Sequence, residues 1–63
     1  MLTIIITQDN KELKRFENQE SDIKALGWLL RNQSNSTSHA IKYEGYKVEV
    51  IDQETKESYF WKS

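Results

Sequence analysis

The side chains best suited to chemistry in this sequence are Trp28 and the two cations near it, Lys24 and Arg31. On a helix, residues four positions before and three positions after the tryptophan are its surface neighbours. An aromatic ring between two cations is suited to stacking a nucleobase or to anchoring a protein interface, where tryptophan is enriched. The competing interpretation is that a second aromatic residue, Phe60 or Tyr43, covers Trp28, because large aromatic side chains are mostly buried.

The charges are distributed unevenly along the chain. No acidic residue occurs between Asp22 and Glu44. The same stretch carries basic residues and the single histidine, which are Lys24, Arg31, Lys42 and His39. We expect a face that meets an anion to be built from residues 23–43. The whole chain has nine Lys and Arg against ten Asp and Glu, and a formal net charge of −1 argues against affinity that comes from neutralising many phosphates.

Catalytic and metal-binding motifs do not occur in the sequence. It has no cysteine and a single histidine, so it offers neither a thiolate zinc site nor a multi-histidine site. No glycine-rich phosphate loop, nucleophile elbow or dinucleotide fingerprint is found. We therefore expect a non-enzymatic protein without cofactor, metal or small-molecule substrate.

The elements that must position these residues centre on one helix, predicted over residues 21–31 (SDIKALGWLLR). Ser21 is its expected N-cap. The predicted buried sector leaves Trp28 outside and comprises Ile23, Ala25, Leu26, Leu29 and Leu30. A helix of this length is marginal alone in water, so it must lie on an apolar surface supplied by strands.

Strands are predicted on both sides of this helix. Residues 2–7 (LTIIIT) alternate as a central strand, and a turn at residues 8–11 leads to a return strand at residues 12–17. The polar run at residues 32–39 favours a loop, and residues 39–43 are compatible with a third strand.

A second hairpin is predicted from residues 46–52 and 57–62. With Glu54 and Thr55 at its tip, Val50 lies opposite Tyr59. Phe60 then points to the other face of the sheet.

Together these elements predict a single α+β domain over residues 1–63, with strand order ββαβββ or ββαββ and the helix on one face of an antiparallel sheet. The predicted core is Ile4, Ile6, Leu13 or Phe16, Ile23, Leu26, Leu30, Val48, Val50 and Trp61. The uncovered face exposes Ile5, Ile51 and Phe60, an apolar surface that suggests a partner or a homodimer.

The segments IKYEGYKVEVID and TIIITQDNKELKRFEN, with the helix ending in WLLRN, give the chain a resemblance to a class of small proteins. It resembles the very small accessory proteins of phages and other mobile elements of Gram-positive bacteria. The resemblance implies a protein that works by binding a host protein or nucleic acid, and it assigns no site residue. The N-terminus lacks the basic start and long apolar run of a signal peptide, so we expect a cytoplasmic protein without a membrane segment.

Two functions follow as hypotheses. The first is a protein-interaction module that uses Trp28 and exposed sheet aromatics such as Phe60. The alternative is a nucleic-acid-binding protein of the winged helix-turn-helix kind, with residues 36–43 as a second helix capped by Ser36 or Thr37. Its contact residues are Lys24, Trp28, Arg31, His39 and Lys42.

Overall fold

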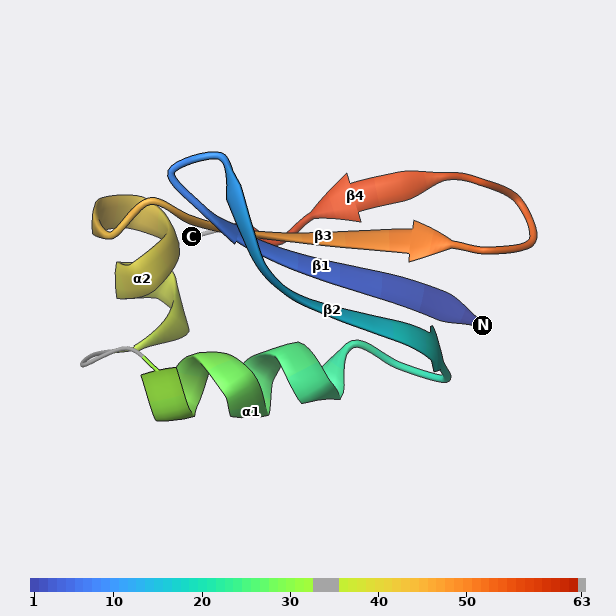
Figure 1. Cartoon of the computed structure of the whole chain (residues 1–63), viewed down its shortest axis with the longest axis horizontal. Coiled ribbons are helices and arrows are strands. Elements are labelled where there is room, and N and C mark those ends of the chain that lie inside the picture. The colour runs from blue at the N-terminus through green and yellow to red at the C-terminus, as the bar shows by residue number, and fades with distance from the viewer. Residues whose placement is uncertain (33–35, 63) are drawn as a thin grey trace.

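Within residues 1–32 and 36–62, which the structure describes, the computed structural model is a four-stranded antiparallel sheet with two helices (Figure 1). The strand order is β2-β1-β3-β4. The elements are β1 Leu2–Gln8, β2 Lys11–Gln19, α1 Ile23–Asn32, α2 Thr37–Tyr43, β3 Tyr46–Asp52 and β4 Ser58–Phe60. The predicted α+β class, with a helix on one face of a small antiparallel sheet, is confirmed.

The first hairpin joins β1 to β2 through a tight turn at Asp9 and Asn10. Both residues have positive φ, 51° and 68°, as a two-residue type I′ turn requires. Gln8 pairs with Lys11 across it, and β1 lies between β2 and β3 as its sequence predicted.

An irregularity in β2 decides which of its side chains face the helix layer. The register shifts beside Leu13, because Ile6 pairs with Lys14 whereas Thr7 pairs with Glu12. After this bulge Phe16 lies opposite Ile4. Of the two predicted core candidates in β2, Phe16 is partly buried against the core and Leu13 is exposed.

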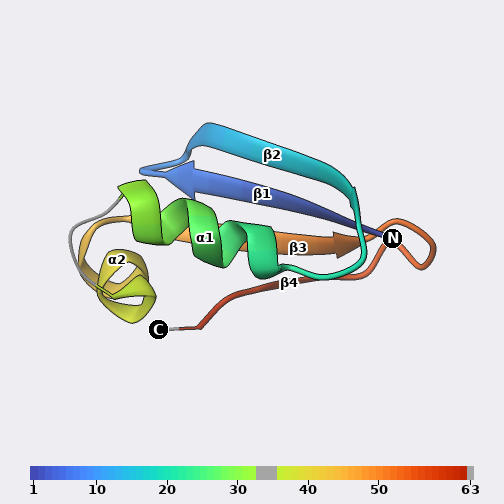
Figure 2. The same ribbon diagram turned by 90° about the horizontal axis from the view of Figure 1, so that it is seen from below.

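The helix α1 lies against the central strands of the sheet (Figure 2). Ala25 and Leu29 are its fully buried residues. They join a core that also contains Ile4, Ile6, Ala40, Tyr46, Val48 and Val50.

The predicted buried sector of α1 is wrong in part. Ile23, Leu26 and Leu30 were expected in the core, but they are 67%, 38% and 57% exposed. The helix is rotated so that Trp28 packs partly against the core next to Leu29. Because an aromatic side chain buries more area than an aliphatic one, this rotation is favoured over one that turns Ile23 inward.

Residues 37–43 form α2, which resolves the choice between strand and helix in favour of a helix. Ser36 is its N-cap, and the Ser36 Oγ accepts a hydrogen bond from the His39 amide at 3.2 Å. Ala40 is the buried residue of this helix. The middle of the predicted polar loop, residues 33–35, lies outside the described residues.

The second hairpin has the predicted register, with Val50 opposite Tyr59 and Glu49 opposite Phe60. The Asp52 carboxylate closes the turn, since its Oδ1 accepts the Glu54 amide at 2.8 Å and the Thr55 amide at 3.3 Å. These two bonds hold the pKa of Asp52 below its usual value. On the uncovered face of the sheet Phe60 is exposed, whereas Ile5 and Ile51 are half-buried.

The orientation of α1 predicts opposite outcomes for two neighbouring leucines. Leu29→Ala should lower the free energy of unfolding by about 3 kcal/mol, because it leaves a cavity in the core. Leu30→Ala should change it by less than about 0.5 kcal/mol, because Leu30 lies in solvent. Urea denaturation followed by circular dichroism measures both, and equal losses would contradict this orientation.

Candidate functional site

A groove of about 480 Å³ lies between β2 and α1. It is lined by two residues of β2 and four of α1, namely Lys14, Phe16, Lys24, Gly27, Trp28 and Arg31. Three of the six carry positive charge and none carries negative charge, although the chain as a whole has a formal net charge of −1. We call this feature the cationic groove.

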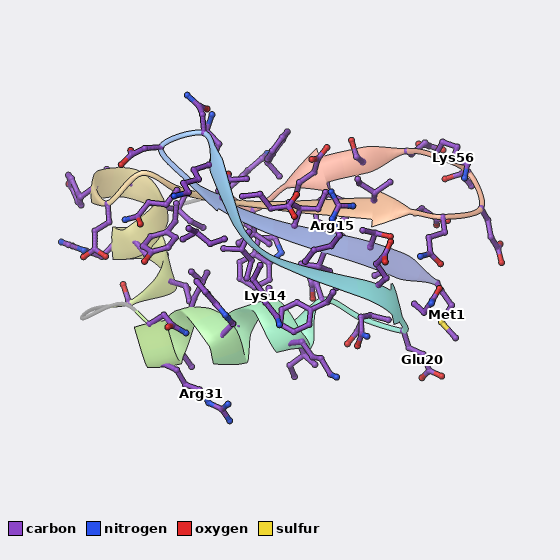
Figure 3. The ribbon with its side chains drawn as sticks, in the orientation of Figure 1. Met1, Lys14, Arg15, Glu20, Arg31 and Lys56 are labelled. Carbon is purple, nitrogen blue, oxygen red and sulfur yellow. The ribbon has the colours of Figure 1, made fainter. Side chains whose placement is uncertain are left out.

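The bulge in β2 places the strand's contribution to the cationic groove. Lys14 lies between β2 and α1, whereas Arg15 lies on the other side of the sheet (Figure 3). The Lys14 Nζ stands 5.4 Å from the centre of the Phe16 ring, within the range of a cation–π interaction. The strand therefore contributes a cation and an aromatic surface to the same side of the groove.

Trp28 is held by the core on one side and lines the groove on the other. Its ring meets Tyr46 edge-on, with centroids 6.4 Å apart and an interplanar angle of 71°. The side chain is half-buried and packs against the core. Trp28 is therefore partly covered, as the competing interpretation expected, but the aromatic residue that contacts it is Tyr46 instead of Phe60 or Tyr43.

A row of apolar side chains adjoins the cationic groove on α1. We call it the apolar ridge, and it consists of Ile23, Leu26 and Leu30. Their spacing of three and four residues aligns them along the helix side that faces away from the core. Gly27, at the edge of the groove, lies between the ridge and the two cations of α1. No atom outside its immediate neighbourhood lies within 4 Å of the position that a Cβ would occupy there.

The start of α1 is fixed to the end of the chain by Asp22. Its Oδ2 accepts a hydrogen bond from the Trp61 Nε1 at 2.8 Å and from the Tyr59 hydroxyl at 3.2 Å. Ser21 is the predicted N-cap, and its Oγ accepts a hydrogen bond from the Ile23 amide at 3.5 Å. Burial, together with the negative charge and hydrogen bond of Asp22, raises the pKa of Tyr59.

The other predicted contact residues lie apart from the groove. His39 and Lys42 belong to α2, where both side chains approach Tyr43: the ring centroids of His39 and Tyr43 are 5.1 Å apart, and the Lys42 Nζ is 5.5 Å from the Tyr43 ring centre. The His39 Nδ1 also lies 3.2 Å from a Glu44 carboxylate oxygen. These residues line neither the cationic groove nor the ridge.

Phe60 lines a second, more apolar hollow of about 300 Å³, formed with Ile41, Gly45, Tyr46, Lys47 and Trp61. Of the six predicted contact residues, the structure thus brings together Lys24, Trp28 and Arg31. Sequence reasoning missed Lys14 and Phe16 as partners of this set. Lys14 and Phe16 alternate along β2, so the sequence does place them on the same face of the strand. Which face of the sheet this is depends on the bulge.

Across residues 1–32 and 36–62, no three His, Asp or Glu side chains gather as a metal site would require. In the same part of the chain, neither helix has the length and apolar character needed to cross a membrane.

No family model matches the chain, and neither a curated protein nor a solved structure matches it.

The raised pKa of Tyr59 predicts how the fold responds to alkaline pH. The folded state favours the neutral phenol of Tyr59. The contribution of this phenol to folding stability is therefore complete below the ordinary tyrosine pKa of 10.0, and it is lost as pH rises through the higher pKa of the folded state. We expect Asp22→Asn to lower the pKa of Tyr59. An NMR titration of labelled tyrosines, with Tyr59→Phe to assign the signal, measures this. Titration of Tyr59 at or below the ordinary value would contradict the contact with Asp22.

Proposed function

We propose that this protein is a non-enzymatic protein-binding module and that α1 is its contact element. The observation that carries the proposal is the apolar ridge, where Ile23 and Leu30 are more than half exposed beside Leu26. Burial of apolar surface is the main favourable term in protein association. We further propose that it is an accessory protein of a phage or mobile element, a class that works by binding.

The cationic groove gives this contact surface a charged flank. Protein interfaces combine an apolar centre, in which tryptophan and arginine are enriched, with a polar rim. The ridge, with the neighbouring Trp28 and Arg31, matches the centre of an interface, and Lys24 matches its polar rim on one side. A partner that covers both buries apolar surface and also pairs its charges.

Nucleic-acid binding is the second candidate, and the composition of the groove favours it. Single-strand sites combine cations with aromatic rings on which bases stack, and the groove holds three cations with Phe16 and Trp28. Against it, a nucleic acid in the groove leaves the apolar ridge in water. His39 and Lys42, which the helix-turn-helix hypothesis requires, lie elsewhere.

A comparison of captured proteins tests the proposed function. Tagged wild-type protein is compared with Ile23→Gln/Leu30→Gln, which removes the ridge, and with Leu13→Gln, which removes an exposed leucine from β2. Glutamine suits a helix, so the ridge variant should keep its circular dichroism spectrum. We expect protein from a lysate of the source cells to be retained by the wild type and by the β2 variant, and lost by the ridge variant.

Salt and nuclease separate the two candidate functions in the same experiment. Contact through apolar surface should persist from low to moderate salt, whereas binding dominated by phosphates weakens steeply over this range. The proposal would be overturned in favour of nucleic-acid binding if nuclease or moderate salt removed the captured material and the ridge variant captured as much of it as the wild type.

A further inference from the structure

We infer that the partner presents an acidic amphipathic helix, which lies along α1 with its apolar side chains on the ridge and its carboxylates in the cationic groove. The inference rests on the proposed function and adds the chemistry of the partner. Three observations carry it: the space at Gly27, the parallel course of ridge and groove, and the sign of the charges.

Gly27 is an unfavourable residue in the middle of a helix, because glycine has a large conformational entropy to lose there. Packing within this chain does not require a glycine here, since nothing lies within 4 Å of a Cβ built at this position. A small residue does allow a second helix to approach the backbone of α1 closely. The open space at Gly27 therefore suits an element from outside the chain.

The ridge and the cations that α1 contributes to the groove lie on opposite sides of Gly27. At about 100° per residue, Ile23 and Leu30 fall to one side of the glycine, and Lys24 and Arg31 fall to the other. Ile23 and Leu30 are seven residues apart, which is about 10 Å along the helix axis. A partner helix centred over Gly27 would meet apolar contacts on one flank and cations on the other for two turns.

Charge favours an acidic partner over a second copy of this chain. In a two-fold antiparallel pair of α1 helices, equivalent flanks lie side by side. Lys24 of one copy would then approach Arg31 of the other, with two copies of Lys14 nearby. Like charges at an interface are unfavourable, whereas carboxylates on a partner would meet all three cations.

The test uses a synthetic amphipathic helix of three heptads as its probe. Its leucine stripe is flanked on one side by glutamates, and a matched peptide carries lysines in their place. Binding to labelled protein is followed by NMR at low salt, with a thymidine oligonucleotide as a third ligand. We expect the glutamate peptide to bind at least about tenfold more tightly than the lysine peptide and to shift ridge and groove resonances.

Charge reversal provides the sharpest comparison. Lys24→Glu/Arg31→Glu should reverse the preference, so that the lysine peptide binds more tightly. Lys11→Glu/Lys56→Glu makes the same change in net charge at the start of β2 and in the β3–β4 connection, and should keep the preference for the glutamate peptide. Equal loss of preference in both double variants would overturn the inference, because the effect would then follow net charge alone.

Gly27→Gln tests the close approach separately from folding. It replaces glycine with a better helix former, so the melting temperature should not fall. We expect the glutamate peptide to bind this variant about tenfold more weakly, because the side chain fills the space over the helix. Unchanged affinity would show that no partner helix approaches Gly27 and would overturn the inference.

The remaining outcomes separate this inference from the proposed function. Equal binding of both peptides, lost in Ile23→Gln/Leu30→Gln, would overturn the acidic helix and leave a protein-binding ridge. Binding of neither peptide would also overturn the inference, while the capture experiment decides the function independently. Tighter binding of the thymidine oligonucleotide in the groove would overturn it in favour of nucleic acid.

Discussion

The structure depends on how α1 meets the two central strands. Ile4 faces Val50 and Ile6 faces Val48 across the β1–β3 pair, and these four buried side chains form a narrow apolar strip. The small stripe of α1 around Ala25 fits against such a strip, because a residue with a short side chain lets the helix approach the sheet. The apolar ridge follows from this rotation of the helix, as do the positions of the four residues that α1 contributes to the cationic groove.

The parts of the fold that the sequence predicts well are local. Alternating side chains and turn residues determine the two hairpins and the register of the second one, since pairing across a tight turn follows from turn length. The rotation of α1 was not predictable in the same way. The helix carries two apolar stripes, one through Ala25 and Leu29 and one through Ile23 and Leu30, and the choice between them depends on the sheet that it meets. The sequence pattern predicts Ile23, Leu26 and Leu30 in the core because it does not distinguish between the two stripes.

The candidate site was predictable only where its residues share one helix. Lys24, Trp28 and Arg31 meet because of helical spacing alone. Lys14 joins them through the bulge in β2, which shifts the register by one residue and leaves no clear mark in the composition of the strand. The near-neutral net charge of the chain also does not show that three cations and no acidic residue line the groove. The local distribution of charge therefore describes this surface better than the net charge does.

The position of the apolar ridge depends on which side of α1 faces water. Methyl groups labelled with carbon-13, observed with a soluble gadolinium complex in solution, report this without any mutation. We expect strong broadening of the methyl signals of Ile23, Leu26 and Leu30, while the signals of Leu29 stay sharp. Strong broadening of Leu29 with protection of Leu30 would contradict this expectation, because the apolar ridge would then be part of the core.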